Sequence, residues 1–185
     1  MTLPETLELL GPFSLASTGD DHDFFAWPFR SPSGVYIFTV PVAESYKAFY
    51  VGMSIDIKWR MREHIRSYLS GQYLLYEPAV ICQGSLDPIY TPCEPEKFLG
   101  RAGELLPKAL ELLRLARIFV LEMPTDTRLL RRVESALIDA AGGSKGGYFK
   151  LENDRVSVRH PDAEKGRIFI LGSKRILDLP SELRA

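Results

Sequence analysis

Two tyrosines, an arginine and a histidine are the side chains of this sequence whose types and spacing best suit chemistry: Tyr36, Tyr50, Arg60 and His64. Hydrolysis of a phosphodiester requires a base for water, a cation over the phosphate oxygens and a Lewis acid at the leaving group. A phenol held near an imidazole or a metal can act as the base, although its free pKa is about 10. A guanidinium suits phosphate, and a glutamate offers hard oxygen ligands to Mg²⁺. Groups of these types could therefore act on a phosphodiester if the chain brings them together.

Two strands are predicted to carry the tyrosines. Residues 35–40 and 49–51 are β-branched or aromatic almost throughout, which is typical of strands. Tyr36 lies in the first run and Tyr50 in the second. The spacer at residues 43–47 is long enough for a hairpin loop, and longer than a two-residue turn.

A helix is predicted to carry the arginine and the histidine. Ser54 or Asp56 can cap its start, its apolar positions recur at helical spacing, and Gly71 is placed to end it. Arg60 and His64 are four residues apart, so they project from the same side of this helix. The strands and the helix together would present two phenols, a guanidinium and an imidazole to one region of space.

The paired runs resemble the motif of the GIY-YIG endonuclease family. Gly34–Tyr36 stands for the first half of the motif and Tyr50–Gly52 for the second. The family pattern continues with a helical arginine ten residues after the second tyrosine and often a histidine one turn later, positions that Arg60 and His64 occupy. The resemblance is good over about residues 33–70.

The resemblance implies an endonuclease that hydrolyses DNA with one divalent ion, Mg²⁺ or Mn²⁺, and without an organic cofactor. It implies Tyr36 as the favoured base, Tyr50 as the group that positions water or phosphate, and His64 as an aid to proton loss. The metal-binding glutamate of the family is matched by Glu134, in a segment at 117–141 that resembles the family in outline.

The segment around the glutamate is predicted to be a strand followed by a helix. Residues 117–123 read as a central strand, and residues 127–141 read as a helix with Asp126 as its N-cap. Glu134 lies at the edge of the apolar stripe of this helix, which favours a role at a site over a solvated face.

An insertion relative to compact family members is expected at about residues 71–100. Within it, residues 79–82 are predicted to form a short strand. The helical pattern at 95–115 contains Pro107, which is expected to break or kink it.

The predicted fold is α+β, with a small, mainly antiparallel three-stranded sheet flanked by helices in one domain spanning residues 1–185. An N-terminal arm, the core and a C-terminal extension follow one another: 1–30, 31–142 and 143–185. The aromatic cluster at 24–29 is expected to pack against the domain, because so much apolar surface is rarely left in water. The extension is expected to form a hairpin from residues 155–159 and 167–171.

The overall composition does not indicate a nucleic-acid-binding protein, because the formal net charge is −1. Basic residues nevertheless gather on the first helix, and affinity for phosphate follows the charges at the contact. Lys58 and Arg62 are therefore candidates for substrate binding. Asn153 is a third candidate, either as a phosphate-holding residue displaced by the glycine-rich loop at 142–147 or as a turn residue. The sequence shows no membrane-spanning run and no signal peptide, and Cys82 and Cys93 lack metal-ligand spacing, so we expect a cytoplasmic protein with reduced thiols.

Each candidate residue also has an ordinary structural interpretation. The tyrosines can be strand aromatics, Arg60 can pair with Glu63 or Asp56, and Glu134 can pair with Arg131 or Arg132. Two other functions therefore remain open. One is a nucleic-acid-binding module of the same fold without catalysis, and the other is a protein-interaction domain that uses the aromatic arm.

Overall fold

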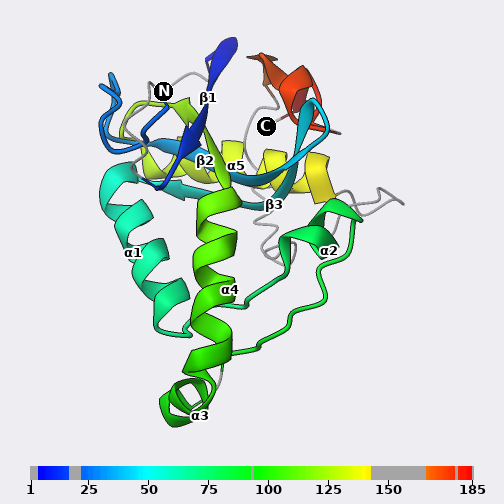
Figure 1. Cartoon of the computed structure of the whole chain (residues 1–185). Coiled ribbons are helices and arrows are strands. Elements are labelled where there is room, and N and C mark those ends of the chain that lie inside the picture. The colour runs from blue at the N-terminus through cyan, green and yellow to red at the C-terminus, as the bar shows by residue number, and fades with distance from the viewer. Residues whose placement is uncertain (1–3, 17–21, 93, 143–165, 178, 185) are drawn as a thin grey trace.

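The computed structural model of the chain describes residues 4–16, 22–92, 94–142, 166–177 and 179–184 (Figure 1). Its elements in chain order are β1 (Thr6–Ser14), β2 (Gly34–Val42), β3 (Ser45–Ser54), α1 (Ile57–Leu69), α2 (Pro78–Cys82), α3 (Pro95–Gly100), α4 (Ala102–Leu115), β4 (Arg117–Glu122), α5 (Thr127–Gly142), β5 (Arg167–Leu171), a 3-10 turn (Ser173–Arg175) and β6 (Glu182–Arg184). No helix in these described ranges is long and apolar enough to cross a membrane.

The strands form one six-stranded mixed sheet in the order β3-β2-β4-β1-β5-β6. β1 pairs parallel with β5, and the other neighbours are antiparallel. The expectation of a small three-stranded antiparallel sheet is therefore wrong. The three strands expected from sequence are present as β2, β3 and β4, but β4 does not end the sheet. Its outer backbone groups pair with β1, which prevents an exposed sheet edge at that position.

The N-terminal strand was missed because its apolar pattern is short. Leu7 and Leu9 are buried on one face of the sheet, while Glu8 between them is exposed. This alternation is the period-two pattern of a strand, so the residues assigned to an arm begin with a strand of the sheet. The later hairpin is also corrected, because β5 pairs with β1 and β6. Residues 155–159 lie outside the described part of the chain.

Helices cover both faces of the sheet. On one face, α1 and α4 run side by side, and α5 lies on the other (Figure 1). Alternate residues of β2 serve the two cores: Tyr36 and Phe38 face α1 and α4, whereas Val35 and Ile37 face α5. Because both of its faces are covered, β2 is buried almost throughout, from Gly34 to Val40. β2 and β3 are joined by a two-residue turn at 43–44, shorter than the loop expected at 43–47.

The insertion forms helices in place of the expected strand. Residues 79–82 belong to α2, and the helical pattern at 95–115 is broken at Arg101, where the backbone leaves the helical region. The expected break at Pro107 is wrong, since that proline lies inside α4. Glycines stand on either side of the actual break, at positions 100 and 103, and glycine is a poor helix former.

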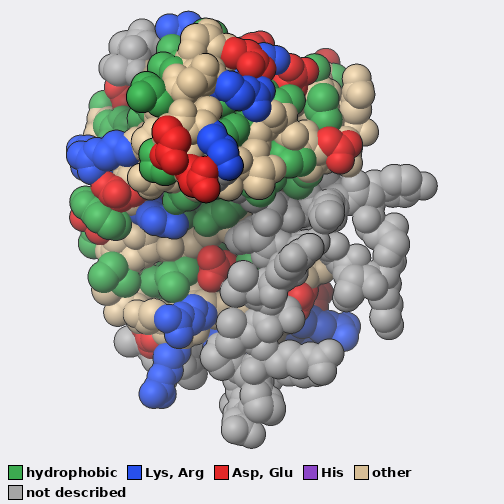
Figure 2. Space-filling view, turned by 90° about the horizontal axis from the view of Figure 1, so that it is seen from below, with side chains coloured by type: hydrophobic (Ala, Val, Ile, Leu, Met, Phe, Trp, Pro, Cys, Tyr) green, Lys and Arg blue, Asp and Glu red, His purple; other side chains and the backbone are tan. Residues whose placement is uncertain are grey.

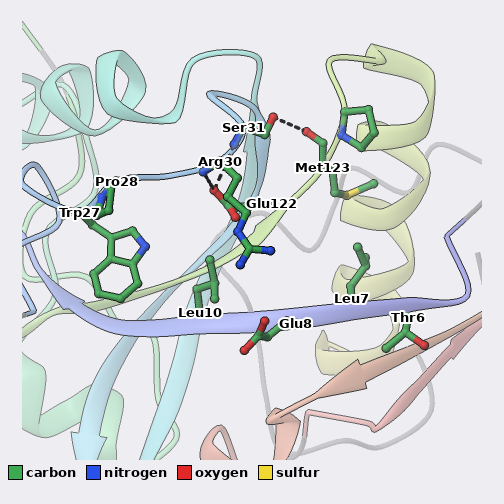
Figure 3. A pocket seen from close by; sticks show the side chains of 11 residues that line it. Thr6, Leu7, Glu8, Leu10, Trp27, Pro28, Arg30, Ser31, Glu122 and Met123 are labelled. Atoms are coloured by element: carbon green, nitrogen blue, oxygen red, sulfur yellow. Dashed lines mark hydrogen bonds between the residues drawn. The ribbon is translucent and has the colours of Figure 1, made fainter.

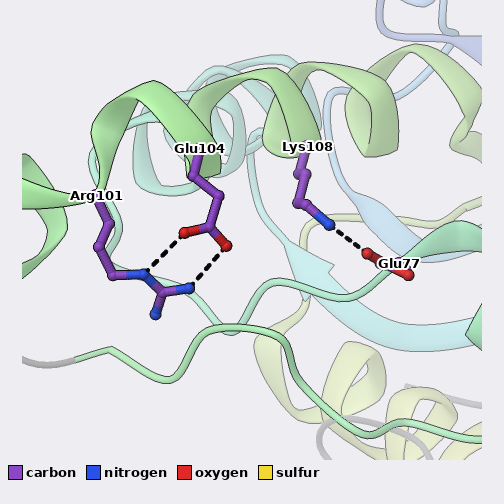
Figure 4. Close-up of polar contacts among 4 residues, drawn as sticks. All are labelled: Glu77, Arg101, Glu104 and Lys108. Carbon is purple, nitrogen blue, oxygen red and sulfur yellow. Dashed lines mark hydrogen bonds and ion pairs between the residues drawn. The ribbon is translucent and has the colours of Figure 1, made fainter.

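Ion pairs lie on the surface of the insertion and of α4. Arg101, just before α4, pairs with Glu104, and Lys108 of α4 pairs with Glu77, just before α2 (Figure 4). On the face seen from below, described side chains of both charge signs lie among hydrophobic ones (Figure 2). Pairs this exposed add little to stability, so the insertion is held mainly by apolar packing of Tyr76, Ile81 and Phe98.

The aromatic cluster packs against the domain, as expected. Phe24 is fully buried, with ring centroids 5.9 Å from Phe13 of β1 and 5.1 Å from Phe29. Phe13 also contacts Trp27, at 5.1 Å. The segment at 22–32 is thereby fixed between β1 and the start of α1.

Replacement of Phe24 by alanine is predicted to lower the free energy of unfolding by about 3–5 kcal/mol, because it leaves a cavity among packed rings. Chemical denaturation of the two proteins measures this difference. Phe169→Ala is the control: this ring is 47% exposed, so the same truncation should cost less than about 1 kcal/mol. Equal losses for the two variants would contradict the packing described for the cluster.

Candidate active site

The two tyrosines lie on the same face of neighbouring strands. Tyr36 of β2 is paired with Gly52 of β3, and Tyr50 is paired with Phe38, so the two phenols are diagonal neighbours across the strands. Their rings stack with centroids 6.2 Å apart and an interplanar angle of 25°. The expected pairing of the two motif strands is therefore confirmed.

Gly52 makes the close approach of the two phenols possible. A Cβ atom at this position would lie 2.5 Å from the Tyr36 hydroxyl oxygen and 2.8 Å from Cε1 of Tyr50. Both distances are shorter than any normal contact, so only glycine leaves room for the Tyr36 ring to cross β3. The glycine of the second motif is thus a steric requirement of the phenol pair.

Helix α1 brings Arg60 and His64 to the buried phenol. The Asp56 side chain caps the helix by accepting a hydrogen bond from the Trp59 N–H, at 2.9 Å. Nε2 of His64 lies 2.8 Å from the Tyr36 hydroxyl, and Nε of Arg60 donates to the same oxygen at 3.4 Å. The sequence-predicted set of Tyr36, Arg60 and His64 is therefore in direct contact.

The electrostatics of this cluster are dominated by burial. Burial, together with the charge of Arg60, lowers the pKa of His64 from 6.5 to about 3, so the imidazole is neutral at physiological pH. Burial also raises the pKa of Tyr36 well above its ordinary value of 10, an effect strengthened by Tyr50 and partly offset by Arg60. The pKa of Tyr50 is raised by burial as well, and Arg60 and the Tyr36 hydroxyl partly offset that rise.

A small cavity opens beside the cluster. It has a volume of about 130 Å³, and its walls combine aromatic and basic side chains: Phe38, Tyr50, Arg60, His64, Tyr68 and Tyr73. Tyr50 is only partly buried and lines this cavity, whereas Tyr36 is 1% exposed. Of the two motif tyrosines, Tyr50 is therefore the one that meets a molecule entering from solvent.

Tyr73 was missed by sequence reasoning. Its ring centroid lies 5.3 Å from that of His64 and 5.3 Å from that of Tyr68. The only signal was an aromatic residue shortly after the glycine that ends α1. The start of the insertion has no periodic pattern of apolar residues. The contact of Tyr73 with the histidine therefore could not be predicted from the sequence.

Glu134 approaches the cluster from the opposite layer. Its carboxylate accepts a hydrogen bond from the backbone N–H of Met53 on β3, the outer strand of the sheet. Burial raises the pKa of Glu134, while the Met53 N–H and the charges of Arg131 and Arg60 partly offset the rise. The charge of Arg60, which contacts Tyr36, thus also acts on the glutamate.

These residues could hold a magnesium ion only through a single carboxylate, with waters and substrate phosphate as the other ligands. No group of three or more His, Cys, Asp or Glu side chains that could hold a metal occurs within the described ranges. Mg²⁺ is commonly bound by one or two carboxylates together with waters and substrate phosphate. Glu134 is the carboxylate that would hold such an ion, since it is partly buried and the charge of Arg60 acts on it.

The two other basic candidates lie in a different hollow. Nζ of Lys58 donates to the Phe25 carbonyl at 2.7 Å, and the Arg62 guanidinium lies 5.1 Å from the Phe25 ring centroid. Both line a groove of about 460 Å³ between α1 and the segment that carries Phe29. They do not line the cavity beside Tyr50. Asn153 lies outside the described residues.

Comparisons of the chain with known protein families, with curated proteins and with solved structures find no match. The likeness to the GIY-YIG pattern therefore rests on the motif residues and on the contacts that they make here.

The buried histidine predicts a pH-dependent stability. The pKa of His64 is depressed in the folded chain, so the unfolded chain binds more protons and stability falls as the pH drops below about 6.5. Between pH 7 and 5 the wild type should lose about 2 kcal/mol more unfolding free energy than His64→Gln. Denaturant unfolding at both pH values measures the difference.

His22→Gln serves as the control for that comparison, because His22 is exposed and its replacement should leave the wild-type pH dependence intact. Identical losses in the wild type and in His64→Gln would mean that His64 titrates normally.

Proposed function

We propose that this protein is a metal-dependent endonuclease that hydrolyses phosphodiester bonds of DNA. The observation that carries the proposal is the Tyr36 hydroxyl, which is held between the imidazole of His64 and the guanidinium of Arg60. A buried phenol of ordinary structural role needs one hydrogen-bond partner. Here it has two ionisable partners and lies against a second phenol that faces a cavity.

The attacking water would lose its proton along a path through the phenols. Tyr50 faces the cavity, so its hydroxyl accepts the proton of water while its own proton passes to Tyr36 and that of Tyr36 passes to Nε2 of His64. The resulting hydroxide attacks phosphorus, and the leaving oxygen takes a proton from solvent. A phosphate bound to Arg60 offsets one of the two effects that lower the pKa of His64, which makes the imidazole a better acceptor when substrate is present.

Arg60 would stabilise the charge on the phosphate. Its Nε atom is engaged by Tyr36, which fixes the plane of the guanidinium beside the cavity. The terminal nitrogens are then preorganised for the non-bridging oxygens, and preorganised donors stabilise charge that develops in a transition state. Lysine would provide the charge without the fork.

Glu134 would hold the divalent ion, Mg²⁺ or Mn²⁺, which supplies Lewis acidity at the leaving oxygen. The carboxylate is fixed by the Met53 N–H at the edge of β3. Arg60 contacts Tyr36, and its charge acts on this carboxylate, so a phosphate bound to Arg60 would also meet the ion. Lys58 and Arg62 line a separate groove on another side of α1, where they would contact phosphates further along the strand.

Replacement of Glu134 by alanine is predicted to reduce Mg²⁺-dependent scission of plasmid DNA by more than about 100-fold, since even outer partners of metal ligands are worth up to that much. Gel analysis of plasmid incubated with and without Mg²⁺ measures it. Asp139→Ala is the matched control, because Asp139 is an exposed acid on the same helix. DNA retention without cutting by the wild type would favour a binding module, and neither retention nor cutting would favour a protein-interaction domain.

Removal of either phenol hydroxyl is predicted to slow cleavage by about 10²–10⁴-fold, the range for loss of general base catalysis. Tyr36→Phe and Tyr50→Phe should lose similar amounts, because each interrupts the same path from water to His64. Tyr73→Phe is the control, since this ring lines the cavity but stands outside the path. Near-normal single-turnover cleavage by Tyr36→Phe would exclude the proton path, even if the protein remains a nuclease.

A further inference from the structure

A second and larger hollow lies away from the phenols, where β1 passes the segment 27–31 and the end of β4 (Figure 3). Its volume is about 730 Å³, within the range of small-ligand pockets. The function proposed above uses none of its residues.

The backbone around this hollow is held firmly. One carboxylate oxygen of Glu122 accepts from the backbone N–H groups of Arg30 and Ser31. The hydroxyl of Ser31 donates to the Met123 carbonyl at 2.7 Å. The arm segment is thus tied to the end of β4, and the position from which the Arg30 side chain starts is fixed.

The Arg30 side chain extends into the hollow between two acids (Figure 3). Glu122 lies above it and Glu8 of β1 lies below it, yet Arg30 forms an ion pair with neither of them, nor with any other described residue. One oxygen of Glu122 already accepts two backbone hydrogen bonds, whereas no hydrogen bond engages the Glu8 carboxylate within the described ranges, so Glu8 offers both of its oxygens to a ligand. The Arg30 guanidinium can only donate hydrogen bonds, and the Glu8 carboxylate can only accept them. The two side chains face each other across the hollow without forming an ion pair.

Trp27 supplies an aromatic wall. Its indole packs against Phe13 at 5.1 Å, is only partly buried and lines the hollow beside Arg30. An indole held in this way is a surface on which a planar ligand can stack, and such stacking is the usual means by which proteins hold unpaired bases.

We infer that this hollow binds a guanine base. Guanine is planar and can stack on Trp27. Its O6 and N7 accept the two-pronged hydrogen bond of an arginine, while its N1–H and 2-amino groups donate to a carboxylate such as Glu8. Adenine carries an amino group where guanine carries O6, so it would place donor against donor at Arg30.

The base can belong to a free nucleotide or to an unpaired nucleotide of a strand. The second source is compatible with the location, because Pro28 lines both this hollow and the groove of Lys58 and Arg62. A strand in that groove would meet the hollow next. The inference itself rests on Trp27, Arg30 and Glu8, and does not require that the protein cleaves DNA.

The fluorescence of Trp27 tests the inference. The chain has two tryptophans, so Trp59→Phe leaves Trp27 as the only one. Titration of this variant without metal is expected to show quenching by GMP and by a single-stranded oligothymidylate that carries one guanine, and little by AMP or inorganic phosphate. A response to GMP alone assigns the pocket to free nucleotides, and a response to the oligonucleotide extends it to strands. Both support a guanine site.

Two substitutions sharpen the test. Arg30→Lys keeps the charge but loses the fork, and Glu8→Gln loses the anionic acceptor, so each should weaken GMP binding by about tenfold or more. Arg128→Lys and Glu96→Gln are exposed controls that should leave it unchanged. Calorimetry of the unaltered chain with GMP gives the same comparison if Trp59→Phe folds poorly.

Absence of GMP binding at millimolar concentration, or equal binding of AMP or phosphate, would overturn the guanine site. Because the titration contains no metal and measures no scission, such a result leaves the proposed nuclease activity untouched. Loss of scission in Glu134→Ala, in turn, leaves the guanine site untouched.

Discussion

The hydrogen-bonded hydroxyl of Tyr36 is the constraint on which the site depends. A phenol that is 1% exposed would lose about 1–3 kcal/mol if its hydroxyl were left without a partner. That cost is avoided because His64 and Arg60 of α1 both reach the hydroxyl oxygen. The same contacts fix the rotation of α1 against the sheet, since a turn of the helix about its axis would break them. Gly52 completes the arrangement, because it allows the ring to pass over β3 without a clash.

The covering of both faces of the sheet explains how distant residues meet. On one face α1 supplies both the arginine and the histidine, while α5 lies on the other face. Glu134 of α5 interacts with the Met53 N–H of β3, the outer strand of the sheet, and the charge of Arg60 also acts on it. The strands β1, β5 and β6 extend the sheet beyond β4, on the side away from β3. They enlarge the core there and do not cover the site.

Several features were predictable because short-range rules decide them. Asp56 caps α1, Asp126 caps α5, and Gly71 has the positive φ that a helix end favours. The errors occurred where a partner distant in sequence decides the structure. Leu7 and Leu9 lie in a strand because the backbone of β1 pairs with both β4 and β5. Tyr73 likewise enters the site from a segment without a clear periodic signal.

The sequence by itself determined which groups are present and how they are spaced along two strands and a helix, because those spacings follow from the periods of two and 3.6 residues. It determined the hairpin of the two motif strands and the shared side of Arg60 and His64, whereas the register that pairs Tyr36 with Gly52 came from the structure. Only the tertiary structure decided that Tyr36 is enclosed while Tyr50 faces the cavity, and that Lys58 and Arg62 turn toward the aromatic segment. Exposure and electrostatic environment depend on residues that pack from other parts of the chain, and local spacing carries no information about them.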